Sequence, residues 1–156
     1  MKTLVIGLGN PILGDDGVGW QIAKEVERSS GSVEVDWLAV GGIGLMERLV
    51  GYDRVILVDS ISSGLAPQGS VLSFSLEEIP DTGMGHLTSA HDTSLQTALQ
   101  VGRLLGAHLP DQVTIVAVES QRVYNFCDTL SPVVSAAVPQ AVRKIFELLN
   151  QNGMEG

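Results

Sequence analysis

The stretch RVILVD, residues Arg54 to Asp59, is an almost continuous run of aliphatic side chains that ends on a carboxylate. A run of this kind is typical of a central parallel strand that is buried on both faces. Apolar runs at 3–6, 33–38 and 113–118 predict three more strands. Residues 70–76 alternate between apolar and serine side chains, which favours a half-exposed strand near an edge of the sheet.

The segments between the predicted strands have the periodicity of helices. Apolar side chains recur at helical spacing after Asp16, through residues 45–50 and after Asp92, and Ser131-Pro132 favours the start of a C-terminal helix. Strands that alternate with helices predict an α/β fold in which a mostly parallel sheet lies between two helix layers. At 156 residues, the chain is predicted to be one domain, residues 1–156.

The composition is that of a compact globular protein, with 44% hydrophobic and only 17% charged residues. The formal net charge is −9 and Lys and Arg do not cluster, which argues against a nucleic-acid partner. No apolar stretch is long enough to span a membrane, and the apolar start of the chain breaks at Gly7 without a signal-peptide cleavage site. Cys127 is the single cysteine and cannot form an internal disulfide. We therefore expect a cytoplasmic protein.

Two carboxylates follow the strands that are expected to meet in the middle of the sheet. Suppose that the strand at 3–6 lies beside the strand at 54–59, and that the strand at 33–38 lies on the outer side of the strand at 3–6. The switch point of the sheet then falls between the strands at 3–6 and 54–59. The loops that leave these two strands contain Asp16 and Asp59. His91, just before the third long helix, would complete a set of two carboxylates and one imidazole, which suits a borderline divalent metal and leaves positions for a substrate. The sequence thus predicts a metal-binding crevice formed by Asp16, Asp59 and His91.

Each of these residues has a structural alternative. Asp15 and Asp16 precede the first helix, where one carboxylate is enough for an N-cap, so we assign capping or loop support to Asp15 and the ligand role to Asp16. Backbone N–H groups of the glycine-rich loop would satisfy a buried Asp59 equally well. A lone histidine is more often structural than a ligand. The three residues together are therefore stronger evidence for a metal site than any one of them alone. We interpret His86 and His108 as loop or surface residues, although His86 could reach the same crevice.

Two other chemistries have weaker support. The loop GLGNP at residues 7–11 resembles a dinucleotide-binding fingerprint, but Ile12 stands where the third glycine would fall, so a tight turn is the simpler interpretation. Cys127 has no histidine or lysine beside it in the sequence to lower its pKa, which favours a buried or loop thiol over a nucleophile.

Five stretches of the chain resemble the endopeptidases that mature the large subunit of nickel-iron hydrogenases. They follow the family's order and spacing across essentially the whole chain. The combination of Asp-Asp-Gly, a third strand that ends on Asp and a downstream histidine is specific. The stretches are GLGNPILGDDGVG at 7–19, VGGIGLMERL at 40–49, VILVDS at 55–60, SAHDTSL at 89–95 and LSPVVSAAV at 130–138.

This resemblance implies a three-layer α/β/α sandwich of the phosphorylase/hydrolase-like kind, with a five-stranded, mostly parallel sheet that has one antiparallel strand. It also implies that Asp16, Asp59 and His91 are the catalytic residues that contact a metal, and Asp16 stands where some members have Glu. Several members carry an acidic residue before the Gly-Gly pair, whereas Val40 precedes Gly41 and Gly42 here, so this chain lacks any support that the acid supplies.

The resemblance further implies an endopeptidase that removes the C-terminal extension of a nickel-loaded hydrogenase large-subunit precursor. Family precedent is cleavage after a basic residue just beyond the last metal-binding cysteine motif. The substrate would carry the nickel, which acts either as a recognition mark or by polarising the carbonyl or water; other divalent cations are expected to fit the same site. The alternatives are a non-enzymatic nickel chaperone that uses the same three ligands, and a nucleotide-binding domain that uses the loop at residues 7–10.

Overall fold

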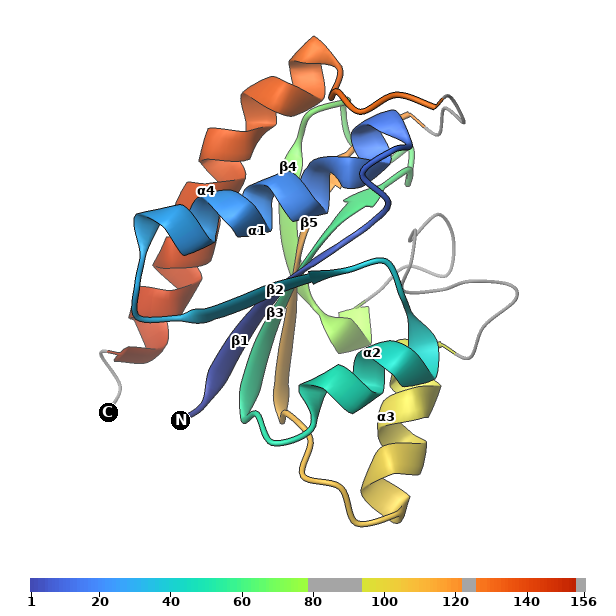
Figure 1. Cartoon of the computed structure of the whole chain (residues 1–156), viewed down its shortest axis with the longest axis vertical. Helices are drawn as coiled ribbons and strands as arrows, with labels where there is room; N and C mark the ends of the chain where they lie inside the picture. Colours follow the sequence, from blue (N-terminus) through green and yellow to red (C-terminus); the bar gives the residue numbers. More distant parts are fainter. Residues whose placement is uncertain (79–93, 122–125, 154–156) are drawn as a thin grey trace.

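A computed structural model describes residues 1–78, 94–121 and 126–153; residues 79–93, 122–125 and 154–156 lie outside the described part of the chain. A five-stranded sheet has the order β2-β1-β3-β5-β4 (Figure 1). The neighbouring strands β2, β1, β3 and β5 are parallel, and β4 pairs antiparallel with β5 at the edge. The strands are β1 (Thr3–Leu8), β2 (Glu34–Leu38), β3 (Arg54–Ile61), β4 (Val71–Ser75) and β5 (Gln112–Glu119). The predicted mostly parallel sheet with one antiparallel strand is therefore confirmed.

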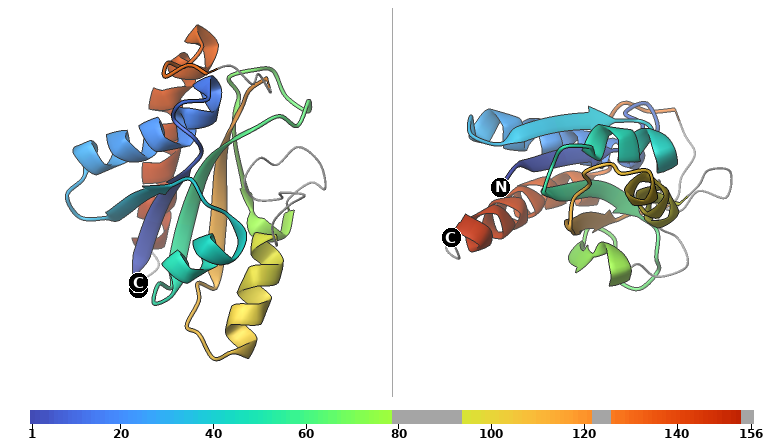
Figure 2. Two further views of the ribbon diagram at one scale, coloured as in Figure 1. Left: turned by 45° about the vertical axis from the view of Figure 1, so that its right-hand side comes forward. Right: turned by 90° about the horizontal axis from the view of Figure 1, so that it is seen from below.

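Helices cover both faces of this sheet (Figure 2). The helices α1 (Val18–Ser29) and α4 (Pro132–Gly153) pack on one face, and α2 (Gly42–Leu49) and α3 (Leu95–Leu104) pack on the other. Two short 3-10 helices complete the described elements, η1 (Gly14–Gly17) and η2 (Leu76–Glu78). The predicted three-layer arrangement is confirmed, and so is the position of β1 between β2 and β3, which puts the switch point between β1 and β3.

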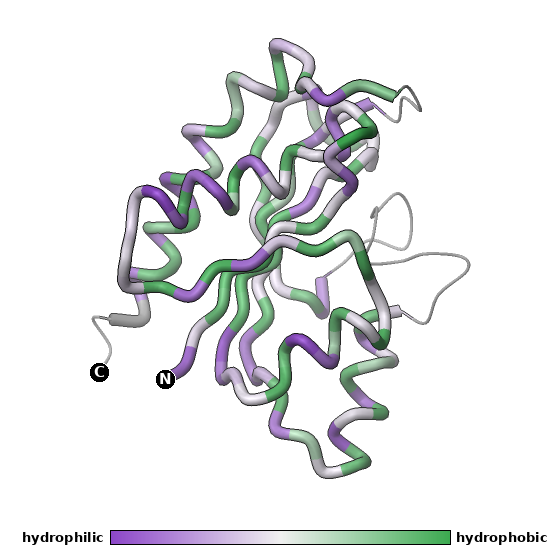
Figure 3. The backbone as a smooth tube through the Cα atoms, viewed as in Figure 1, coloured by the Kyte–Doolittle hydropathy of each residue, from purple (hydrophilic) through white to green (hydrophobic). Residues whose placement is uncertain are grey.

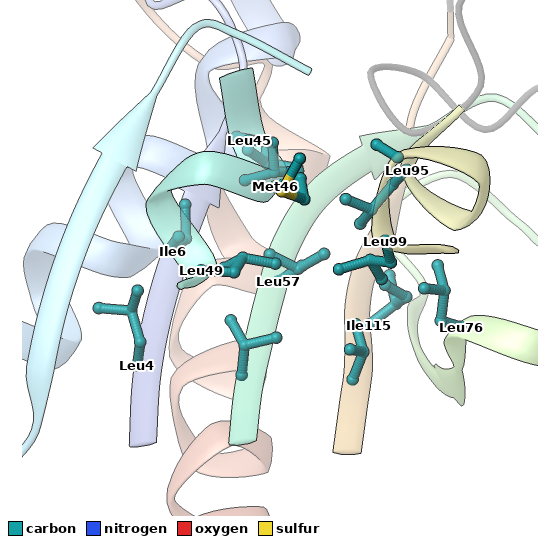
Figure 4. Close-up of a cluster of buried hydrophobic side chains, with 14 of the residues drawn as sticks. Leu4, Ile6, Leu45, Met46, Leu49, Leu57, Leu76, Leu95, Leu99 and Ile115 are labelled. Carbon is teal, nitrogen blue, oxygen red and sulfur yellow. The ribbon is translucent and has the colours of Figure 1, made fainter. Parts of the chain in front are cut away.

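The central strand β3 is buried along its whole length, as a strand covered on both faces must be. Because side chains alternate along a strand, Leu57 joins the core under α2 and α3 while Ile56 joins the core under α1 and α4. Figure 4 shows the first of these cores, in which Leu49 and Leu99 meet side chains from the sheet. These apolar layers supply the main favourable free energy that keeps the loops of the sheet in place.

The start of α1 is pressed against the two central strands. A Cβ atom at Gly19 would lie 2.4 Å from the carbonyl oxygens of Leu8 and Val58, and one at Gly7 would lie 2.2 Å from the carbonyl oxygen of Gly19. Only glycine permits an approach this close. The close approach fixes the loop between β1 and α1, which contains η1, at the carboxyl edge of the sheet.

Hydropathy follows the layers of the fold. In Figure 3 hydrophobic and hydrophilic residues alternate along each of the four helices, as expected for helices that cover a sheet on one side and face solvent on the other. Within the described residues, no helix combines the length and the apolar character that crossing a membrane requires.

Asp53, at the opposite, amino edge of the sheet, is expected to make stability depend on pH. The N–H of Lys2 donates to its carboxylate (2.7 Å) and His108 contacts it (2.9 Å), and these partners, Lys2 first, lower the pKa of Asp53. A lowered folded-state pKa gives stability that is present above the ordinary carboxyl value of about 4 and is lost as the pH falls through the folded value. The Asp53→Asn variant should therefore melt below the wild type at pH 7, and this difference should shrink as the pH falls below the ordinary carboxyl value of about 4. Melting curves at several pH values check this, and a difference that does not change with pH would contradict it.

Candidate functional site

Asp16 and Asp59 lie together at the switch point between β1 and β3. Asp16 belongs to η1, in the connection from β1 to α1, and Asp59 is near the carboxyl end of β3. Ser60 links them, because its N–H donates to Asp59 Oδ1 (2.8 Å) and its hydroxyl donates to Asp16 Oδ1 at a long 3.5 Å. Two of the three residues predicted for the site are therefore neighbours in the structure.

The carboxylate of Asp59 is completely buried in the middle of the sheet. An ionised carboxylate in such a place is costly unless hydrogen-bond donors or a cation compensate its charge. The adjacent N–H of Ser60 supplies one such bond. Buried carboxylates of this kind concentrate at functional sites, so Asp59 is a strong candidate on physical grounds.

Asp16 is held by the glycine-rich loop that leaves β1. The N–H of Asn10 donates to Asp16 Oδ2 (2.9 Å), and a Cβ atom at Gly9 would lie 2.0 Å from the backbone oxygen of Asp16. Gly9 also has a φ of +140°, which favours glycine. Backbone of this chain fills the space beside Gly9, so the glycine pattern of this loop is explained by a tight turn, as the simpler interpretation predicted.

Asp15 does not cap the first helix. Gly17 occupies the N-cap position of α1, without a side-chain cap, whereas Asp15 accepts hydrogen bonds from the N–H (2.7 Å) and the hydroxyl (2.8 Å) of Ser131. These two bonds join η1 to the residue that precedes α4. The capping alternative is therefore wrong for both aspartates, and Asp15 supports the loop through a contact between residues far apart in the sequence.

A second connection strengthens this junction of loops. Leu13 forms an isolated bridge with Cys127, in which Gly14 N–H donates to the carbonyl oxygen of Cys127 (2.7 Å) and Cys127 N–H donates to that of Ile12 (2.9 Å). The β1–α1 loop and the segment before α4 therefore form one unit beside Asp16.

Glu119 is a buried carboxylate that the sequence analysis missed. It ends β5, is 4% exposed and accepts hydrogen bonds from Ser63 N–H (2.9 Å), the Ser63 hydroxyl and Gly64 N–H (3.4 Å). These bonds fasten the connection between β3 and β4 to the same edge of the sheet. The signal was available, because Glu119 follows the apolar run at 113–118 just as Asp59 follows an apolar run in β3.

The histidines contribute less to the described site. His91 and His86 lie outside the described residues, whereas His108 is exposed at the amino edge, where it contacts Asp53, in agreement with its interpretation as a surface residue. In residues 1–78, 94–121 and 126–153, no three side chains of His, Cys, Asp or Glu are grouped closely enough to hold a metal ion. The structure thus brings Asp16 and Asp59 together, and the predicted ligand role of His91 stays a prediction.

Cys127 is an exposed loop thiol. A hydrogen bond with the Thr129 side chain, at 3.1 Å, is the main reason that the pKa of this thiol is lowered, while the nearby charges of Asp128 and Asp15 oppose the shift. The charged groups that influence it are carboxylates, which do not stabilise a thiolate. Its surroundings agree with the predicted loop thiol.

Known proteins resemble this chain over nearly all of its length. A family model described as hydrogenase maturation protease matches residues 20–148. The chain is 27% identical to the hydrogenase 2 maturation protease of Escherichia coli K12, covering 99% of this chain and 94% of that protein. It is 26% identical to the hydrogenase expression/formation protein HupD of Thiocapsa roseopersicina, covering 98% of this chain and 70% of that protein.

The fold has the same relatives. The structure of the hydrogenase maturating endopeptidase HybD from E. coli aligns with a TM-score of 0.76 and 25% sequence identity, covering 98% of this chain and 94% of that chain. The solution structure of an endopeptidase from E. coli aligns with a TM-score of 0.79 and 26% identity over the same fractions. Both the sequence and the architecture therefore match over the whole described sheet.

Proposed function

Because the chain belongs to the hydrogenase maturation protease family and is thus an endopeptidase, we propose that it removes the C-terminal extension of a nickel-loaded large-subunit precursor of a nickel-iron hydrogenase, in the cytoplasm. The observation that carries the proposal is the meeting of Asp16 with the fully buried Asp59 through Ser60. Carboxylates presented at the carboxyl edge of a parallel sheet are placed where such folds bind their substrates.

The donor chemistry supports nickel that arrives with the substrate. Two carboxylates, with His91 as the proposed third ligand, make an incomplete set for a borderline divalent metal, so the substrate's own ligands would supply the rest. In the hydrolysis, the oxygen of water adds to the scissile carbonyl carbon, the C–N bond breaks, and the released amine takes a proton. Nickel held between enzyme and precursor would either place this bond correctly or polarise the reacting carbonyl or water.

A processing assay with and without nickel tests this proposal. Purified precursor is prepared in both forms and incubated with the protein, and intact mass spectrometry follows the loss of the extension. The nickel-loaded precursor should be shortened, and the nickel-free precursor should stay at full length, because nickel completes the contact with Asp16, Asp59 and His91. Equal shortening of both forms would rule out the nickel-dependent version.

A nickel-binding experiment distinguishes the proposed endopeptidase from the alternative of a nickel chaperone. A chaperone would bind nickel tightly by itself, whereas a site that the substrate completes should bind the free ion weakly. Isothermal titration of the isolated protein with a nickel salt measures the difference. Tight binding of the free ion without any processing of the precursor would favour the chaperone.

A further inference from the structure

Two large apolar side chains are exposed beside the candidate site. Ile12, in the loop that carries Asp16, is 53% exposed, and Phe126, in the segment before α4, is 85% exposed. We call this pair the apolar lip. Exposed apolar side chains that gather at one edge of a fold are the kind of surface that proteins use for interaction.

The backbone holds the two sides of the lip together. Cys127, directly after Phe126, donates its N–H to the carbonyl oxygen of Ile12 (2.9 Å), and its own carbonyl oxygen accepts from Gly14 (2.7 Å). The two bonds of Ser131 to Asp15 fasten the same two segments a few residues further on. The lip is therefore built into the unit that also places Asp16, rather than carried on an independent loop.

The charge around the lip indicates what kind of partner fits. The described connections at the carboxyl edge of the sheet, residues 9–17, 39–41, 62–70 and 126–131, contain no Lys or Arg. Asp15 and Asp16 lie in the same loop as Ile12, and the exposed Asp128 lies two residues after Phe126. The described part of this edge thus carries apolar and acidic side chains, which complement a segment that carries apolar and basic side chains.

We propose that the apolar lip of Ile12 and Phe126 docks an apolar segment of the large-subunit precursor, with the basic side chains of that segment facing the surrounding carboxylates. The inference rests on the proposed function and names the surface through which this enzyme binds its substrate. Continuity of the lip with the loop of Asp16 is the reason for choosing the precursor over a second copy of the chain. Docking at the lip would add affinity for the precursor that nickel alone does not provide.

A pair of matched double variants tests the lip. In Ile12→Ser/Phe126→Ser, binding to immobilised nickel-loaded precursor should weaken about tenfold or more, since exposed aromatic anchors carry much of the affinity of an interface. The precursor concentration at half-maximal processing should rise by the same factor, with the maximal rate kept within about twofold. Leu104→Ser/Leu105→Ser is the control, because these side chains are 86% and 81% exposed at the end of α3, away from the site. The single variant Phe126→Leu keeps an apolar side chain at this position and leaves Ile12 unchanged, so it should keep most of the wild-type affinity for the precursor.

Each outcome decides the inference. If the lip variant has the melting temperature of the wild type and unchanged affinity for the precursor, the lip is not a docking surface. If light scattering shows that the wild type self-associates and the lip variant is monomeric with unchanged precursor affinity, the lip joins two copies and the inference is wrong. Binding of the precursor that depends on the lip, without any processing, would support the docking surface and overturn the proposed nickel-dependent cleavage. Normal processing by the lip variant at all precursor concentrations would overturn the docking surface and leave the proposed cleavage standing.

Discussion

Replacement of Gly19 by alanine is expected to destabilise the protein by about 3 to 5 kcal/mol, the range of the most disruptive single substitutions. The new methyl group would lie 2.4 Å from the carbonyl oxygens of both Leu8 and Val58. Both oxygens belong to strands in the middle of the sheet, so neither can move aside as the end of a flexible side chain would. For a chain of this length, the melting temperature should fall by roughly 10 °C or more.

Gly31→Ala is the matched control for this substitution. Nothing lies within 4 Å of the Cβ position of Gly31, so the variant should change the free energy of unfolding by less than about 0.5 kcal/mol. Urea and thermal unfolding, followed by circular dichroism, measure both variants. A Gly19→Ala protein that melts at the temperature of the wild type would show that α1 can move away from β1 and β3 without cost.

The position of Gly19 also connects stability to the site. α1 begins directly after η1, so any outward shift of α1 moves Asp16 relative to Asp59. A partly folded Gly19→Ala protein should therefore lose processing activity as well. The glycines at 7–19 are the physical reason that α1 and the loop that carries Asp16 can start so close to the sheet.

Most of the sheet could be predicted because its signals are local. The run at 54–59 predicts a strand buried on both faces, and β3 is buried throughout. The alternation at 70–76 predicts an edge strand, and β4 is the antiparallel edge of the sheet, its residues partly or fully exposed. The periodicity of apolar residues shows which faces of a strand or helix are buried, and the layers of the fold determine which faces those are.

The contacts of the loops could not be predicted in this way. Local rules assign Asp15 or Asp16 to the cap of the first helix, yet Asp15 bonds to Ser131 and Asp16 to the N–H of Asn10. The partner of Asp15 is distant in sequence and is brought close only when α4 packs beside α1. Periodicity carries no information on such pairings, which is also why the role of Glu119 in holding the β3–β4 connection emerged only from the structure.

Replacement of Asp59 by asparagine is expected to slow processing of the nickel-loaded precursor by about a hundredfold or more, the usual cost of removing one well-placed charge from a reaction centre. Asparagine keeps the shape of the side chain and its oxygen can still accept the N–H of Ser60. It removes the negative charge that would attract the metal. Single-turnover processing, measured by intact mass at saturating precursor, gives the rate.

The stability of the same variant separates a functional charge from a structural one. Asp59 is completely buried, so loss of its charge also removes the free-energy cost of keeping an ion away from water. Asp59→Asn should therefore melt at or above the temperature of the wild type while its processing collapses, which is the behaviour of a site where activity is maintained against stability. Asp53→Asn, at the amino edge of the same sheet, should show the opposite pattern, with lower stability at pH 7 and normal processing. If Asp59→Asn instead unfolds at lower temperature and its remaining folded fraction processes the precursor at the normal rate, then Asp59 serves the fold and is not the proposed metal contact.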